Sequence, residues 1–152
     1  MIYRVETQDT EGLRMILTIH DEMPLVWDPT HRPSQEFTEK LITEIQARTE
    51  PQGFWILAKS KPLSIDSVDG ILWATVKKSH VNLVCSIASL WIRPELRNEK
   101  LTHHLTDACL SWAKEHRAQR LVCSTHSENS RMREILEKND FAPEMISFTR
   151  NL

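Results

Sequence analysis

Two histidines stand at points of the sequence where an imidazole could take up a proton during catalysis. His80 precedes an apolar run at residues 81–92, and His126 follows a shorter apolar run at 120–125. Imidazole titrates close to neutrality, and an amine must lose its surplus proton before it can attack a carbonyl carbon. Both residues are therefore candidate general bases. A surface histidine, or one with a structural hydrogen bond, is the alternative at each position.

A second group of reactive side chains falls in a segment where three prolines between residues 21 and 33 predict an irregular loop. Its acidic and aromatic residues are Asp21, Glu22, Trp27 and Asp28. Carboxylates beside an indole would suit a positively charged amine. A solvated acidic loop is the other interpretation of the same residues.

The sequence argues against several other kinds of site. Only 3 of the 152 residues are glycine, and neither G-x-G-x-x-G nor G-x-x-x-x-G-K-[ST] occurs. The adjacent His103 and His104 would point about 100° apart on a helix, so no metal site is predicted. No G-x-S-x-G elbow supports a Ser-His-Asp hydrolase. A formal net charge of −2 and a pI near 6.4 argue against nucleic acid as a partner.

The hydrophobic pattern predicts the elements that must position these side chains. Runs rich in branched and aromatic residues predict strands, and apolar residues three and four apart predict helices. The expected order is β-α-α-β-β-β-α-β-α-β, with helices that begin near residues 10, 35, 101 and 130 and strands at 2–5, 54–58, 71–76, 81–92, 120–125 and 145–149.

This order predicts one α/β domain over residues 1–152, with a central mixed sheet of about six strands and four helices. The run at 81–92 is long for a strand, which indicates a bulge or bend. The strand-helix-strand unit at 81–125 should form a right-handed parallel crossover.

The cysteines indicate the redox environment. Cys85, Cys109 and Cys123 are odd in number and form no C-x-x-C pair, so we expect reduced thiols in a cytoplasmic protein. The N-terminus lacks an apolar signal region, and no apolar run is long enough to cross a membrane. The sequence leaves the oligomeric state open, a homodimer included.

The stretch from Ile87 to Phe141 resembles the GNAT superfamily of acyl-CoA-dependent N-acyltransferases. The central motif of that family is hydrophobic, any, hydrophobic, any, Pro-Glu, any, Arg, and this chain reads Leu90-Trp91-Ile92-Arg93-Pro94-Glu95-Leu96-Arg97. The family's asparagine at the end of its fifth strand falls on Asn129. Its closing Glu-Lys-x-Gly-Phe is matched by Glu137-Lys138-Asn139-Asp140-Phe141.

The resemblance implies acetyl-CoA, or another acyl-CoA, as co-substrate. A strand parted from its neighbour by a bulge can bond the pantetheine arm as if it were a further strand, and a helix N-terminus can receive the pyrophosphate. Asn129 would support the strand edge or the cofactor. The implied pantetheine edge is Leu90, Trp91 and Ile92, and the implied pyrophosphate turn is Arg97, Asn98, Glu99, Lys100, Leu101 and Thr102. The apolar trio would equally suit a plain core strand.

The chain departs from the family where catalysis and phosphate binding are concerned. Lys100 and Thr102 stand where the family has glycine or alanine, and Leu136 stands where many members have a tyrosine that protonates the departing thiolate. The family's carboxylate base falls near Ser86, which is a poor base. By the family's geometry His126 is then the first candidate base and His80 the second, and a water relay is the alternative.

The sequence therefore predicts an acyl-CoA-dependent N-acyltransferase that moves an acetyl group to an amine by direct attack. The acceptor would be a small molecule or peptide, held by the acidic and aromatic loop described above. A domain of the same fold that has lost catalysis and serves as a binding or regulatory module is the alternative function.

Overall fold

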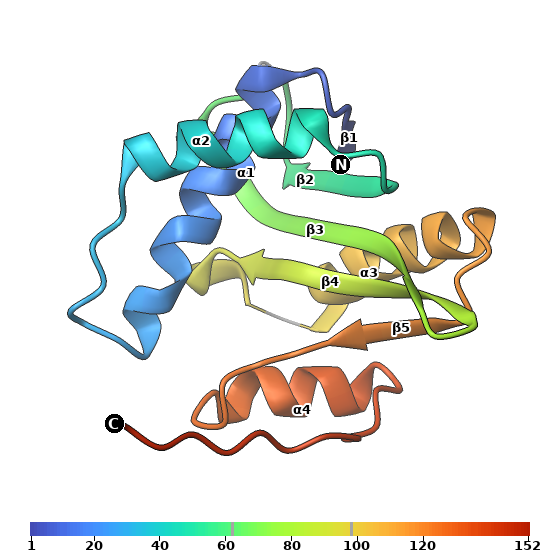
Figure 1. Ribbon diagram of the computed structural model, residues 1–152. Helices are drawn as coiled ribbons and strands as arrows, with labels where there is room; N and C mark the ends of the chain where they lie inside the picture. The colour runs from blue at the N-terminus through green and yellow to red at the C-terminus, as the bar shows by residue number, and fades with distance from the viewer. Residues whose placement is uncertain (62, 98) are drawn as a thin grey trace.

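The computed structural model describes residues 1–61, 63–97 and 99–152, which contain one five-stranded sheet (Figure 1). Its strands follow the chain in the order β1-β2-β3-β4-β5, antiparallel except for the parallel pair β4 and β5. The strands are β1 (Ile2–Val5), β2 (Gln52–Ala58), β3 (Val68–Ser79), β4 (Asn82–Ile92) and β5 (Arg120–Cys123).

Three of the α-helices that the structure describes begin where the sequence places side chains that cap free backbone N–H groups. Asp9 accepts from the N–H of Gly12, Ser34 from that of Phe37, and Asn129 from that of Met132. The helices are α1 (Thr10–Glu22), α2 (Gln35–Ala47), α3 (Glu99–Glu115) and α4 (Ser130–Lys138), and the short 3-10 turns are η1 (Met23–Val26), η2 (Ile65–Ser67) and η3 (Pro94–Leu96). Among the described residues no helix is both long and apolar enough to cross a membrane.

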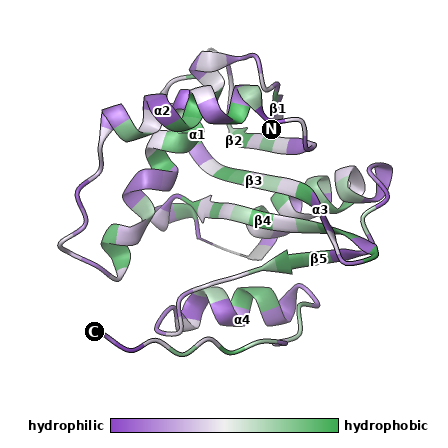
Figure 2. Cartoon of the chain, viewed as in Figure 1, coloured by the Kyte–Doolittle hydropathy of each residue, from purple (hydrophilic) through white to green (hydrophobic). Residues whose placement is uncertain are grey.

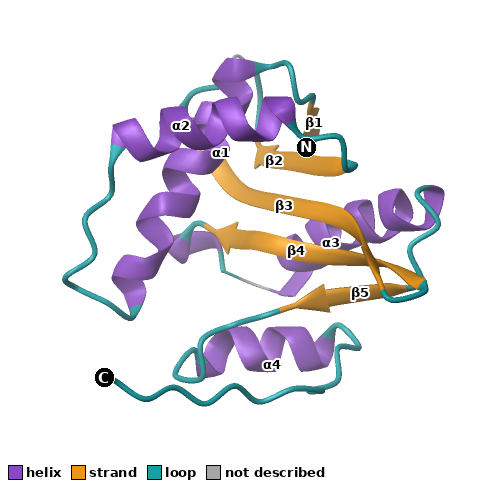
Figure 3. Ribbon diagram, in the orientation of Figure 1, coloured by secondary structure: helices purple, strands orange, loops and turns teal. Residues whose placement is uncertain are grey.

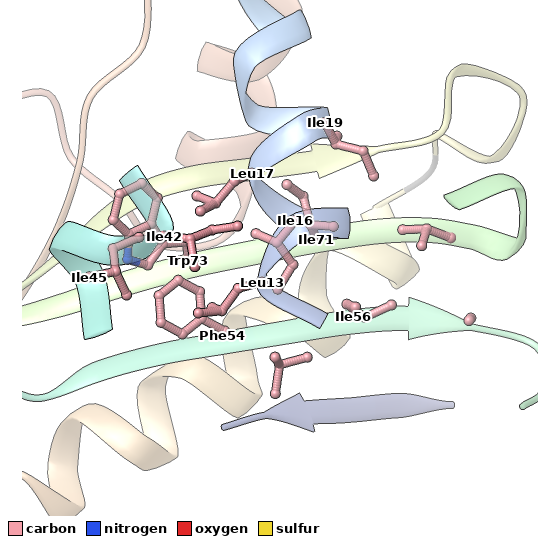
Figure 4. Packing of buried hydrophobic residues seen from close by; sticks show 13 residues of the cluster. Leu13, Ile16, Leu17, Ile19, Ile42, Ile45, Phe54, Ile56, Ile71 and Trp73 are labelled. Atoms are coloured by element: carbon pink, nitrogen blue, oxygen red, sulfur yellow. The ribbon is translucent and has the colours of Figure 1, made fainter. Parts of the chain in front are cut away.

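The sheet has helices on both faces, and each face has its own apolar core. On one face Leu13 and Ile16 of α1 and Ile45 of α2 pack against Phe54 and Trp73 (Figure 4). On the other face Leu105, Cys109 and Trp112 of α3 pack against alternate residues of the strands. Burial on both faces explains why β2 reads as a continuous apolar run, and Figure 2 colours β5 and much of β3 as hydrophobic.

A bulge at Ala88 divides β4 into two halves. Trp73 pairs with Ser89 and Ala74 with Ile87, so Ala88 is one extra residue without a partner on β3. Because of it, odd-numbered Cys85 and Ile87 and even-numbered Leu90 and Ile92 all face α3. The bulge expected from the length of this run is therefore present.

The expected last strand is the one error in the element order. Residues 141–152 contain neither helix nor strand, and Figure 3 draws this segment as a loop beneath α4. Phe148 is 91% exposed there. The alternating apolar residues at 145–149 suit a strand, but a strand also needs a hydrogen-bonding neighbour, and the segment pairs with none of the described strands. The sheet has five strands instead of about six.

Candidate functional site

An open pocket lies where β4, η1, α3 and α4 come together, at the carboxyl end of β4. Apolar side chains from β4, η1 and α4 form most of its wall, and two guanidinium groups lie at its polar side. The described residues that line it are Met23, Val26, Trp27, Leu90, Trp91, Ile92, Arg97, Thr102, Asn129, Arg131, Met132 and Ile135.

The splay between β4 and β5 creates the strand edge of this pocket. Their parallel ladder ends at the pair Ile87 and Cys123, whereas β4 continues to Ile92. From the bulge at Ala88 onward, β4 therefore pairs with no described strand on the β5 side (Figure 1). Backbone groups along such an edge can pair with an extended ligand. The predicted trio Leu90, Trp91 and Ile92 lies on this edge and lines the pocket.

Two arginines form the cationic side of the pocket, and backbone carbonyls orient both. Arg97 Nε donates to the carbonyl of Ile92 at 3.1 Å, and Arg131 Nη2 donates to the carbonyl of Arg97 at 2.8 Å. Neither guanidinium forms an ion pair with a carboxylate in the part of the chain that the structure describes. Anchored, unneutralised guanidinium groups are suited to bind phosphate oxygens.

The remaining residues of the predicted pyrophosphate turn lie in different surroundings. Thr102 is buried and lines the pocket, whereas Lys100 is exposed on the first turn of α3 and Leu101 packs against the core beneath that helix. Glu99 begins α3. Asn98 and the side chain of Glu99 lie outside the described residues.

Two aromatic rings meet beside the pocket. The indole of Trp27, which follows η1, stacks on the imidazole of His126, with ring centroids 5.6 Å apart and planes 13° from parallel. His126 Nδ1 accepts from the backbone N–H of Glu128 at 3.3 Å. In the neutral ring the proton is therefore assigned to Nε2.

The other two candidate catalytic residues, His80 and Ser86, lie before the carboxyl end of β4, away from the pocket. His80 is in the turn before β4 with a φ of 54°, at the opposite end of that strand from the pocket (Figure 1). Ser86 pairs with Thr75 and Val122, just before the ladder between β4 and β5 ends. Neither residue lines the pocket.

The expected loop is wrong for Asp21 and Glu22, which lie in the last turn of α1, because the helix continues almost to Pro24. None of the acidic residues at 21–28 is among the described residues that line the pocket. Asp21 is 8% exposed; its carboxylate accepts from Ser34 N at 2.7 Å and lies 3.2 Å from His31 Nε2. Asp28 accepts from the hydroxyl and the N–H of Thr30, which lowers the pKa of Asp28. Glu22 is exposed. Of the four residues predicted to hold the acceptor, Trp27 alone belongs to the described lining.

A half-buried histidine lies one element away from the pocket. His20 of α1 meets the indole of Trp73 edge-on at 5.4 Å, and burial lowers the pKa of His20, while nearby Asp21 opposes that shift. Trp73 is opposite Ser89 on β4, whose hydroxyl contacts Met23 Sδ at 3.1 Å. These contacts connect the α1 face of the sheet to the wall of the pocket.

Sequence reasoning missed five residues of the lining: Met23, Val26, Arg131, Met132 and Ile135. By sequence, Arg131 belongs to a basic cluster with Arg117, Arg120 and Arg133 that is more typical of a solvated face, although it comes two residues after Asn129, in the first turn of α4. Its position beside Arg97 depends on the long-range approach of α4 to the β4–α3 turn, which no local pattern records.

Comparisons with known proteins agree on the family to which the chain is similar. A model described as "Acetyltransferase (GNAT) domain" matches residues 1–142. No curated protein matches the chain. A crystal structure of a probable acetyltransferase is similar, with a TM-score of 0.75, 17% identity and coverage of 100% of this chain and 97% of that one.

Two aminoglycoside enzymes have the same fold. AAC(6')-Iy, in complex with the bisubstrate analogue CoA-S-monomethyl-acetylneamine, has a TM-score of 0.72 and 17% identity, with coverage of 100% of this chain and 97% of that one. An aminoglycoside acetyltransferase from an uncultured soil metagenomic sample, in complex with sisomicin, has a TM-score of 0.74 and 12% identity, with coverage of 100% and 95%. At such identities the likeness shows the fold alone.

Proposed function

This chain belongs to the GNAT acetyltransferase family, and on that premise we propose that it transfers an acyl group, in the first instance acetyl, from CoA to an amine. The observation that carries the proposal is the splayed edge of β4 with the Arg97 and Arg131 guanidinium groups beside it. An apolar strand edge next to two cations matches a ligand that has an extended amide arm and a polyphosphate group.

In this proposal the β4 edge holds the pantetheine arm. Leu90 and Ile92 are anchored in the α3 core, so the edge is rigid before any ligand arrives. Gly70 lies opposite Ile92 in the ladder, where a Cβ would come within 2.7 Å of Ile92 Cδ1. The lack of a side chain at position 70 lets β3, β4 and α3 approach closely behind the site.

The phosphates would bind at the α3 end of the pocket. The positive end of the α3 dipole and the side chains of Arg97 and Arg131 favour an anion there. Asn98, Glu99, Lys100, Leu101 and Thr102 stay assigned to this turn. Arg131 supplies a cation from α4 at a turn that lacks both family glycines. Asn129, as the N-cap of α4, fixes where that helix begins and so where Arg131 lies.

The reaction would be a direct attack. The amine nitrogen forms a bond to the thioester carbonyl carbon, the C–S bond breaks, and its electron pair leaves with the sulfur. The surplus proton of the amine passes to water or to His126, which stays our first candidate among the side chains. Because its Nδ1 already accepts a hydrogen bond, neutral His126 offers an N–H more readily than a lone pair, which favours the water route.

One observation favours the second candidate function, a binding module without catalysis. Leu136 is buried, and its aliphatic side chain has no hydroxyl that could protonate the thiolate, where many members of the family have a tyrosine. A site that binds CoA and never turns over would have this appearance.

The experiment that separates the two functions is product detection by mass spectrometry. The protein is incubated with acetyl-CoA and a panel of amines that includes phenethylamine, spermidine and kanamycin, and N-acetylated product is sought. Product above the enzyme-free rate, lowered by Lys100→Glu, supports transfer and the assigned turn. Tight acetyl-CoA binding without product on any amine favours the module.

A further inference from the structure

We propose that the acceptor amine is carried on an aromatic or other apolar body and that Trp27 selects it. This inference rests on the proposed acyl transfer. It differs from the expectation that the acidic residues at 21–28 hold the positively charged amine.

The first support is the character of the wall on the η1 side. Met23, Val26 and Trp27 contribute a thioether, an aliphatic and an indole surface to the pocket, in that order. Trp27 is 39% exposed and Val26 is 68% exposed. Exposed apolar side chains gathered at the wall of a pocket are typical of a surface that an apolar ligand covers.

The second support is the sign of the charges. The charged side chains among the described lining are the cations Arg97 and Arg131. The described lining therefore offers no carboxylate that could pair with the several positive charges of a polyamine or an aminoglycoside.

The third support is that the carboxylates of the loop are already engaged. The Asp21 carboxylate accepts a hydrogen bond from Ser34 N–H and contacts the His31 ring. The Asp28 carboxylate accepts from the Thr30 hydroxyl. Turning either carboxylate toward a ligand would leave donors of the loop unsatisfied, and for the buried Asp21 that loss is costly.

The geometry of the ring pair also limits how Trp27 can act. One face of the indole is covered by His126, so it offers its other face and its edge to a ligand. A planar or aliphatic body can pack there and leave its amino group near the β4 edge. A single face without a supporting carboxylate is a weak site for a doubly or triply charged amine.

The test is calorimetric titration of amines into the protein saturated with CoA, so that it reads binding without turnover. Phenethylamine is expected to bind at least tenfold more tightly than spermidine or kanamycin. Trp27→Ala should weaken the binding of phenethylamine about tenfold through loss of buried apolar area. Trp27→Asp should weaken the binding of phenethylamine and strengthen that of spermidine. The matched control is Phe37→Ala, which removes a 51% exposed aromatic from α2 and should change neither amine.

The results separate this inference from the proposed function. Three results would overturn the inference: spermidine or kanamycin binds more tightly than phenethylamine, Trp27→Ala binds phenethylamine as tightly as the wild type does, or no amine binds. In each case, CoA binding leaves the proposed function standing. If acetyl-CoA itself does not bind, both are overturned.

Discussion

Trp27, just after η1, and His126, in the segment after β5, stack on each other with ring centroids 5.6 Å apart. One ring comes from the segment after α1 and η1, and the other from the segment after β5, so the stack joins the two parts of the chain that flank the β4 edge. The positions of both rings therefore depend on the whole fold.

The stack leads to a prediction about His126. His126→Ala removes the surface against which Trp27 packs, so the KM for the acceptor should rise several-fold while kcat falls less than tenfold. Kinetics with saturating acetyl-CoA measure both constants. A fall in kcat of a hundredfold or more, together with loss of the rise in rate with pH, would instead identify His126 as the general base.

Asp21 should matter for folding and not for acceptor binding. Asp21→Asn leaves the N–H of Ser34 and the ring of His31 with a weaker partner, and we expect a loss of about 1–3 kcal/mol in the free energy of unfolding. The KM for the acceptor should stay unchanged. Asp28→Asn, an exposed change in the segment after η1, is the control, and a rise in KM confined to Asp21→Asn would contradict this role.

His20 gives the protein a pH-dependent stability. Because burial lowers the pKa of His20 in the folded protein, the unfolded chain binds a proton first as the pH falls below about 6.5. Stability from this group is complete above that pH and decreases toward the folded pKa, by at most about 1.4 kcal/mol per pH unit. Urea unfolding at neutral and mildly acidic pH should show a smaller decrease for His20→Gln. An equal decrease would contradict the prediction.

Asp140 has a left-handed backbone conformation with a φ of 65°, directly after Asn139, the C-cap of α4. Phe141 N–H bonds to the carbonyl of Leu136 there and closes the helix. The resembled family has glycine at this position, which adopts a positive φ without a steric penalty. Asp140→Gly should therefore raise the free energy of unfolding by about 0.5–1 kcal/mol, measured by urea unfolding. Destabilisation would mean that the Asp140 side chain contributes more than its backbone strain costs.

Much of this fold could be predicted from the sequence, because the apolar periodicity is strong where elements are buried. The cap at Ser34, the α3 face and the long bulged β4 all follow from local patterns. The segment at 145–149 failed because strand propensity says nothing about whether an edge is available to pair with.

The site was predictable only in part. The β4 edge and Arg97 lie within one motif, Asn129 is a separate position of the family pattern, and all of them line the pocket. Arg131 and Met23 reach it through tertiary packing, and the loop carboxylates are engaged by partners that are distant in the sequence or in the loop itself. Composition could show that acids are present in the loop but not where they point.

The most direct test of the proposed acyl transfer is calorimetric titration of acetyl-CoA into the wild-type protein, Arg131→Ala and Arg133→Ala. Arg133 is an exposed arginine on the same helix and does not belong to the described lining. Loss of a charge-assisted phosphate contact is expected to weaken binding by Arg131→Ala about tenfold or more, while Arg133→Ala stays within twofold of wild type. No acetyl-CoA binding by the wild type, or equal weakening by both variants, would contradict a CoA site between β4 and α4.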